Sequence, residues 1–222
     1  MCGFVVCIGK CNRTEIYNAT VKINYRGPDD TNYFFDDKNQ IYVGHNRLAI
    51  MDPEFGRQPI VSGDKRIIIA YNGEIYNQFK LRKELSEKNI NLKSSSSDTE
   101  LVMKGYQHWG KSIFEKLDGQ FAIAIIDLRI NKIYLARDIF GEKPLFYSIE
   151  KDRIIIGSEL KVFSEFNNKE LEFLKMNLYY ILYRISNKKH TYWGARLVAF
   201  AFSQATSVLN VFCSGLDFKS FT

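Results

Sequence analysis

The cysteine at position 2 has the most specific chemistry of any residue in this sequence. Cys2 stands directly after the initiator Met1. Removal of Met1 would leave a cysteine whose own α-amine lies a few bonds from its thiol, so one residue would carry a nucleophile and a base. An α-amino group titrates near pH ~7.7–8.0 and a free thiol near ~8.5, which makes proton transfer between them easy. The alternative is that Cys2 is a small apolar residue at the start of a buried strand, as we expect of Cys7.

Further polar residues that could act with Cys2 recur in five short strings. These strings are Arg26–Asp29 (RGPD), Gly44–Ile50 (GHNRLAI), Tyr71–Asn77 (YNGEIYN), Ser97–Glu100 (SDTE) and Ala136–Leu145 (ARDIFGEKPL). Arg47 follows an apolar strand and offers a planar fork to a carboxylate, with a structural salt bridge as its alternative role. Asp98, at an expected helix start, could cap the helix, bind an ammonium group, or do both.

In this order, and behind an N-terminal Cys-Gly, the strings closely resemble the glutaminase domain of glutamine-hydrolysing asparagine synthetases. Those domains are class II amidotransferases of the N-terminal-nucleophile hydrolase superfamily. The likeness covers residues 2–166 and ends with Gly157–Lys161 (GSELK). It implies an α+β fold, a four-layer αββα sandwich of antiparallel sheets covered by helices. It also implies hydrolysis of the glutamine side-chain amide through a Cys2 thioester, which releases glutamate and ammonia for asparagine synthesis.

The resemblance also assigns roles to individual residues. Cys2 is the nucleophile, and the Asn72 side-chain amide with the Gly73 backbone N–H forms the oxyanion hole; the alternative for Asn72-Gly73 is a simple turn. Glutamine is a zwitterion, so its site needs a cation for the α-carboxylate and an anion for the α-ammonium. The expected substrate-binding residues are Arg47, Ile50, Glu74 and Asp98. The segments Gly27–Asp29 and Gly141–Pro144 are expected to be architectural, without a catalytic role.

The composition is that of a globular protein and argues against several other functions. The chain has 222 residues, of which 45% are apolar and 25% charged, with a formal net charge of +6. Lys and Arg are scattered, so we expect no nucleic-acid partner. The four Cys and three His lack metal-ligand spacing, so we expect no metal site. No secretory signal precedes the first strand, which predicts a cytoplasmic protein.

Clusters of apolar residues indicate antiparallel sheets with helices between them. Strands are predicted at 3–9, 41–46 and 66–71, and hairpins at 121–128 with 132–137 and at 144–149 with 153–157. Helical spacing of apolar residues predicts helices at 76–88 and 98–109. These elements must bring the five strings together around the N-terminus.

The sequence changes character after residue 166, so we predict a glutaminase domain at 1–166 and a diverged or truncated tail at 167–222. The segment Cys213–Phe218 resembles a degraded form of the ATP-binding loop of a following synthetase domain. We expect no cofactor for the glutaminase step, and ATP and Mg²⁺ only with a separate synthetase domain. Residues 197–213 lack charge but are too short and polar for a membrane span, so no membrane partner is expected.

Two alternatives to the asparagine-synthetase interpretation remain open. The chain could be a stand-alone amidotransferase subunit that supplies ammonia to another acceptor, or a non-catalytic remnant. Glutamine is the expected substrate, and a synthetase partner chain and a homodimer are possible assemblies.

Overall fold

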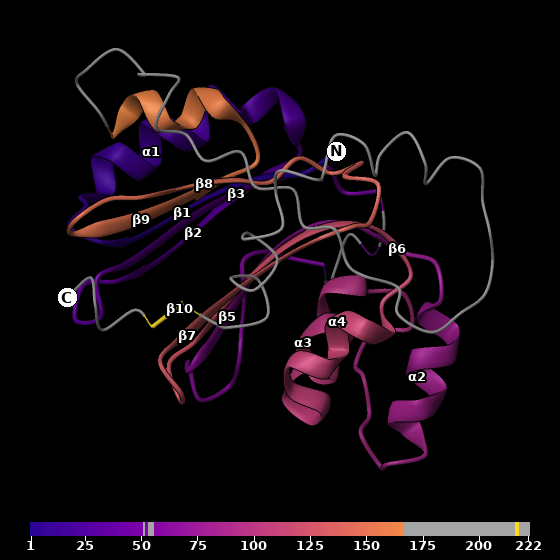
Figure 1. The fold of residues 1–222 in the computed structure, drawn as a ribbon. Coiled ribbons are helices and arrows are strands. Elements are labelled where there is room, and N and C mark those ends of the chain that lie inside the picture. Colours follow the sequence, from indigo (N-terminus) through magenta and orange to yellow (C-terminus); the bar gives the residue numbers. More distant parts are fainter. Residues whose placement is uncertain (51, 53–55, 167–215, 218–222) are drawn as a thin grey trace, which may run out of the picture.

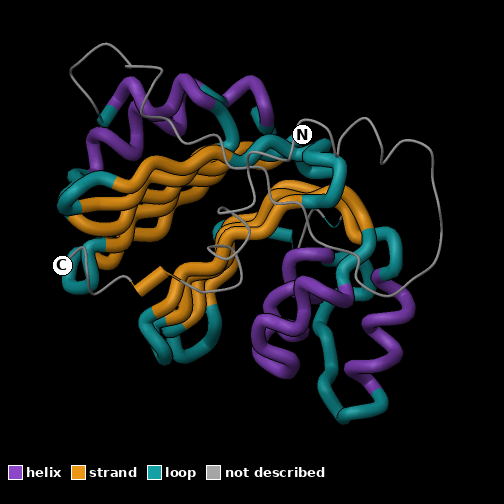
Figure 2. The backbone as a smooth tube through the Cα atoms, viewed as in Figure 1, coloured by secondary structure: helices purple, strands orange, loops and turns teal. Residues whose placement is uncertain are grey.

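The computed structural model describes residues 1–50, 52, 56–166 and 216–217, which form two facing antiparallel sheets between two layers of helices (Figures 1 and 2). The first sheet has the strand order β2-β3-β1-β9-β8. Its strands are β1 (Gly3–Gly9), β2 (Asp30–Asp36), β3 (Ile41–Arg47), β8 (Phe146–Ile149) and β9 (Arg153–Gly157). Each hydrogen-bonded pair of neighbours in it is antiparallel.

The second sheet has the order β10-β7-β6-β5-β4, again with antiparallel neighbours. Its strands are β4 (Ile60–Val61), β5 (Ile67–Ile75), β6 (Gly119–Asp127), β7 (Lys132–Arg137) and β10 (Leu216–Asp217). The long central pair β5 and β6 runs in register from Ile67 opposite Asp127 to Ile75 opposite Gly119. The two residues of β10 come from the predicted ATP-loop remnant, most of which lies outside the described residues.

Helices cover the outer face of each sheet (Figure 1). The first sheet is covered by α1 (Arg13–Lys22), with the short 3₁₀ helices η1 (Asn24–Arg26) and η3 (Leu160–Glu165) beside it. The second is covered by α2 (Gln78–Ser86), α3 (Asp98–Trp109), η2 (Gly110–Ser112) and α4 (Ile113–Lys116). This arrangement confirms the predicted αββα sandwich.

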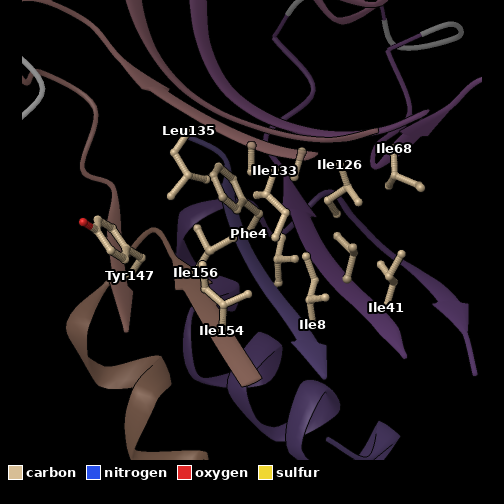
Figure 3. Close-up of a cluster of buried hydrophobic side chains, with 14 of the residues drawn as sticks. Phe4, Ile8, Ile41, Ile68, Ile126, Ile133, Leu135, Tyr147, Ile154 and Ile156 are labelled. Carbon is tan, nitrogen blue, oxygen red and sulfur yellow. The ribbon is translucent and has the colours of Figure 1, made fainter. Parts of the chain in front are cut away.

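The core follows from the two-residue period of the strands. Phe4, Val6 and Ile8 of β1 point into the layer between the sheets, where they meet side chains of the second sheet (Figure 3). Val5 and Cys7 point the other way and pack beneath α1, which confirms the buried position expected of Cys7. Because both faces of each sheet are covered, the central strands are almost continuously apolar.

Several elements were absent from the sequence prediction, and α1 and β2 are the longest of them. Helix α1 buries only Ile16, Ala19 and Thr20, so its apolar face is too narrow to be recognised from periodicity. Its start does carry a signal, because Asn12 and Glu15 form a reciprocal capping box. Strand β2 lies at the edge of its sheet and is only partly buried, so it lacks the apolar run of the central strands.

Candidate active site

A cavity of about 240 Å³ lies where the N-terminus meets the ends of β3 and β5. It is lined by every residue that the sequence analysis assigned to the site: Cys2, Arg47, Ile50, Asn72, Gly73, Glu74 and Asp98. Its wall also contains residues to which the sequence analysis gave no catalytic or binding role, among them Gln58, Tyr71, Gln120 and Lys143.

The position of Cys2 is fixed by contacts on both sides of the chain start. The Arg26 Nε donates to the Cys2 carbonyl oxygen at 3.0 Å, and the Arg26 guanidinium pairs with Glu159 at 2.8 Å. Two residues after Cys2, the Phe4 N–H donates to Ser158 Oγ at 3.0 Å. The Ser158 N–H in turn donates to the Phe4 carbonyl oxygen, also at 3.0 Å. The RGPD and GSELK strings therefore anchor the start of β1, which holds the partly buried Cys2 at the cavity wall.

The N-terminal amine lies at the same wall. Burial lowers the pKa of the Met1 α-amine, and the nearby cations of Arg26 and Lys143 act in the same direction, whereas Cys2 and Asp29 raise it. A lowered pKa leaves more of the amine neutral at working pH, and a neutral amine can accept a proton.

Asn72 and Gly73 lie inside β5, opposite Ala122 and Phe121 of β6, so the alternative of a simple turn is wrong. Only 2% of the Asn72 surface is exposed, and its buried Nδ2 has no hydrogen-bond partner among the residues that the structure describes. A Cβ at position 73 would lie 2.2 Å from the Gln120 carbonyl oxygen, which only glycine avoids. Strand β5 thus places the unused amide donor of Asn72 next to Gly73, where the backbones of β5 and β6 approach each other closely.

Asp98 is the first residue of α3, but the prediction that it caps the helix is wrong. The cap is Ser97, whose hydroxyl oxygen accepts from the Glu100 N–H at 3.3 Å. The Asp98 Oδ2 instead accepts from the Ile75 N–H at 2.9 Å and from the Tyr71 hydroxyl at 3.3 Å. Its Oδ1 is buried and has no hydrogen-bond partner in the described part of the chain, and burial raises the pKa of this carboxyl group. Asp98 therefore faces the cavity with one unused acceptor.

Arg47 ends β3 and is 4% exposed. Its guanidinium donates to the Asp52 carbonyl oxygen and packs against Gly56, where a side chain would collide with it. The following segment is held by Asp29, whose carboxylate accepts from the Ala49 N–H at 2.8 Å. This is the architectural role expected of Gly27–Asp29.

Glu74 and Ile50 form an exposed part of the cavity wall. Ile50 is 74% exposed, and Glu74 lies on the open side of β5. Both can contact a bound molecule only at the mouth of the cavity.

Beneath the cavity, His45 of β3 connects the two sheets. Its Nε2 donates to the Tyr71 carbonyl oxygen of β5 at 3.0 Å, since a carbonyl can only accept. His45 is completely buried, and this burial lowers its pKa to about 4, so the ring is neutral. Gln58 supports the same residue of β5, because its Oε1 accepts from the Tyr71 N–H at 2.8 Å.

Facing antiparallel sheets between helices, with an N-terminal cysteine at their open end, define a hydrolase fold of the N-terminal-nucleophile class. Solved amidotransferases share this architecture. Glutamine phosphoribosylpyrophosphate amidotransferase from B. subtilis, complexed with ADP and GMP, matches with a TM-score of 0.61 and 19% identity, over 74% of this chain and 43% of that one. The allosteric regulatory enzyme of purine biosynthesis matches with a TM-score of 0.59 and 20% identity, over the same shares.

The sequence model of the family described as glutamine amidotransferase domain matches residues 1–203, and this chain belongs to that family. Asparagine synthetase (glutamine-hydrolyzing) 1 of Bacillus subtilis (strain 168) is 38% identical over 168 residues, which are 72% of this chain and 26% of that protein. Asparagine synthetase (glutamine-hydrolyzing) 1 of Arabidopsis thaliana is 34% identical over 167 residues, 72% of this chain and 28% of that protein. The chain thus spans about a quarter of the length of these relatives.

The family match continues past residue 166, and the predicted boundary there stays a prediction. In the described ranges, no helix is long and apolar enough to cross a membrane. The same part of the chain holds no group of three or more His, Cys, Asp or Glu side chains that could bind a metal ion.

Proposed function

We propose that this chain hydrolyses the side-chain amide of glutamine with Cys2 as the nucleophile, after removal of Met1. One observation carries the proposal. A single cavity combines Cys2 with a buried amide donor and a buried carboxylate oxygen, neither of which has a hydrogen-bond partner among the described residues. An unused buried donor and acceptor are costly unless a ligand pairs with them.

In the proposed reaction the Cys2 α-amine takes the thiol proton, and the sulfur attacks the amide carbon of glutamine. The Asn72 amide and the Gly73 N–H donate to the resulting oxyanion. The C–N bond then breaks as the α-ammonium returns its proton to the nitrogen, which leaves as ammonia. Water, deprotonated by the same amine, cleaves the glutamyl thioester and yields glutamate and the free thiol.

The substrate's charged end pairs with residues on the far side of the cavity. Arg47 binds the α-carboxylate, and the unused Oδ1 of Asp98 accepts from the α-ammonium. Glu74 and Ile50, at the mouth, contact the amino end and close over it. Since the ionic groups flank the amide donors, the cavity suits a zwitterion with a neutral amide.

Asparagine is the proposed destination of the ammonia, because the relatives are named glutamine-hydrolysing asparagine synthetases. A synthetase domain or partner chain, with ATP and Mg²⁺, would then carry out the second reaction in the cytoplasm. In this proposal residues 1–166 form the hydrolytic unit, which needs no cofactor, and residues 167–222 lead toward the synthetase. A stand-alone amidotransferase with another acceptor would differ only in its partner, which co-purification identifies.

The decisive experiment follows glutamate release by the purified chain, with intact mass reporting Met1 removal. Cys2→Ala is expected to abolish hydrolysis. A chain that retains Met1 is expected to be inactive, because the Cys2 nitrogen is then part of a peptide bond and cannot act as the base. Cys11→Ala is the matched control, because Cys11 lies beyond the far end of β1 and is not among the residues that line the cavity. Hydrolysis that survives in Cys2→Ala would refute the proposal.

A further inference from the structure

Tyr71 lies on β5 directly before Asn72, and the sequence analysis gave its side chain no role. It lines the cavity although only 3% of its surface is exposed. Its hydroxyl donates to Asp98 Oδ2 at 3.3 Å, which joins β5 to the first residue of α3. Burial raises the pKa of this phenol, and the charge of Asp98 acts in the same direction, so the hydroxyl stays a donor at working pH.

The backbone of Tyr71 is held by two buried side chains. No strand pairs with this edge of β5 beyond Ile69 in the described ranges, because β4 has only two residues. The Gln58 Oε1 accepts from the Tyr71 N–H at 2.8 Å, and the His45 Nε2 donates to the Tyr71 carbonyl oxygen at 3.0 Å. These two bonds replace the missing strand neighbour, and they fix the point from which the phenol reaches Asp98.

The two oxygens of the Asp98 carboxylate have different surroundings. Oδ2 accepts from both the Ile75 N–H, at 2.9 Å, and the Tyr71 hydroxyl. Oδ1 is buried, and none of the described residues donates to it. Two donors on the same oxygen oppose rotation of the carboxylate, which would exchange the two oxygens. Oδ1 is therefore left as the acceptor for a bound molecule.

The charge of Asp98 depends on the same contacts. Burial raises its pKa, and Glu74 acts in the same direction, whereas the Ile75 N–H, the Tyr71 hydroxyl and the Arg82 cation lower it. A protonated Asp98 forms no ion pair with an ammonium group, so a donor that stabilises the carboxylate favours the binding of a cation. The other ionisable residues of the cavity wall are Cys2, Arg47 and Lys143, together with the Met1 amine.

We propose that Tyr71 is a positioning residue for the α-ammonium of glutamine, whose hydroxyl holds the Asp98 carboxylate so that Oδ1 meets this group. Tyr71 acts through Asp98 and not by its own contact with the substrate. The inference rests on the proposed function, which pairs Asp98 with the α-ammonium. It gives the tyrosine of the YNGEIYN string a role separate from that of the Asn72-Gly73 pair beside it.

The first test measures steady-state glutamate release by Tyr71→Phe, which keeps the ring and removes the hydroxyl. KM for glutamine is expected to rise about tenfold, with kcat within about twofold of the unmodified chain. The rise of KM toward acid pH is expected to begin about one pH unit higher, because the Asp98 carboxylate loses a stabilising donor. An unchanged KM with an unchanged pH dependence would overturn the inference.

Tyr106→Phe is the matched control for the loss of a buried hydroxyl. The Tyr106 hydroxyl donates to the buried Asp127 at 2.9 Å, and neither residue lines the cavity. Both substitutions are expected to lower the melting temperature, since each removes a hydrogen bond to a buried carboxylate. Only Tyr71→Phe is expected to change KM. An equal rise of KM in Tyr106→Phe would show a loss of general stability and would overturn the inference.

A double-mutant cycle tests whether Tyr71 acts through Asp98. The KM of Tyr71→Phe with Asp98→Asn is expected to lie within about twofold of that of Asp98→Asn alone, because the charge that Tyr71 positions is already absent. Effects that multiply in the double variant would show that Tyr71 acts independently of Asp98, and they would overturn the inference.

A binding experiment separates this inference from the proposed function. Cys2→Ala with Met1 removed is titrated by competition calorimetry with glutamine and with glutaramate, the analogue that lacks the α-amino group. Adding Tyr71→Phe is expected to weaken glutamine binding about tenfold and to leave glutaramate binding within about twofold. An equal loss for both ligands would overturn the inference and leave the proposed function intact. A chain that binds no glutamine even with Tyr71 present would refute the proposed function, and this inference with it.

Discussion

At the scale of residues, the position of the unpaired polar atoms is the strongest argument for a binding site. Among the described residues, four buried side-chain atoms have no hydrogen-bond partner: His45 Nδ1, Asn72 Nδ2, Asp98 Oδ1 and Glu150 Oε1. Two of the four belong to residues of the cavity wall. Each such atom costs about 1–3 kcal/mol. A donor and an acceptor left unused in one cavity are what a ligand with both an oxyanion and an ammonium group requires.

Replacing Asn72 should separate catalysis from stability. Asn72→Ala is expected to lower kcat by about 10²–10³-fold, the usual loss for one oxyanion donor. Its melting temperature should hardly change, because no hydrogen bond of the amide nitrogen is lost.

Asn77 is the matched control, because its side chain makes two hydrogen bonds, to the Lys116 carbonyl at 2.8 Å and from the Asp118 N–H at 3.1 Å. Asn77→Ala should lower the melting temperature and leave kcat within a few-fold. Equal kcat losses in the two variants, measured by glutamate release and thermal unfolding, would contradict the role of Asn72.

Replacing Asp98 should act on binding rather than on turnover. Asp98→Asn keeps an oxygen for the Ile75 N–H but removes the charge, so KM for glutamine is expected to rise by about 10–100-fold with little change in kcat. Because burial raises the pKa of Asp98, KM of the unmodified chain should begin to rise with falling pH above the usual aspartate pKa of 3.8. Steady-state kinetics across this range check both effects, and a KM that the substitution leaves unchanged would exclude Asp98 from the ammonium site.

The seven residues assigned to the site came from the N-terminal Cys-Gly and short, distinctive strings, and all seven line one cavity, while their roles stay predictions. The supporting contacts were not. Ser97 rather than Asp98 caps α3, because the Asp98 carboxylate accepts hydrogen bonds from Ile75 and Tyr71 of β5 instead. Gln58 and Lys143 join the wall only through the folding of segments far apart in the chain, which local sequence does not encode.

At the scale of elements, the bond between His45 and Tyr71 ties β3 of one sheet to β5 of the other directly beneath the site. The folded-state pKa of His45, about 4, is below the ordinary histidine value of 6.5. The unfolded chain therefore binds more protons between these two values, and stability falls as pH drops from 6.5 toward 4. For this fully buried ring the loss is of the order of 3 kcal/mol.

This pH dependence can be tested by urea unfolding at several pH values. His45→Gln retains a donor toward Tyr71 but does not titrate, so its stability should decline much less below pH 6.5. His108→Gln, at an exposed position of α3, should retain the decline of the unmodified chain. A decline that persists unchanged in His45→Gln would assign the effect to other groups.

The strands were predictable from the sequence where both of their faces are buried. Strands β1, β6 and β9 are apolar along most of their length because both sheets are covered, and their predicted bounds differ from the observed ones by at most two residues. Strand β5 extends four residues beyond its predicted end, because the pairing with β6 continues through the polar Asn72–Glu74. Helix α1 was missed because its few buried residues include a threonine.

At the scale of the whole molecule, the described part of the chain forms both the layered core and the cavity of the proposed site. Three apolar clusters fill the spaces between α1 and the first sheet, between the two sheets, and between the second sheet and α2–α4. All the cavity residues lie between Met1 and Lys143. The proposed function therefore assigns glutamine binding to residues within the described part of the chain.

Because every residue assigned to the site lines this cavity, the proposed function predicts that the chain alone both binds and hydrolyses glutamine. Thermal unfolding of Cys2→Ala, which binds without turnover, should shift upward by about 5–10 °C at a glutamine concentration of 100 Kd. The double variant with Asp98→Asn should shift much less at the same concentration. The unmodified chain should release glutamate and ammonia in equal amounts, unaffected by ATP, Mg²⁺ or aspartate. A chain that shows neither the thermal shift nor glutamate release would contradict the proposed function. It would support the alternative of a non-catalytic remnant, because the polar atoms of Asn72 and Asp98 would then have no glutamine to pair with.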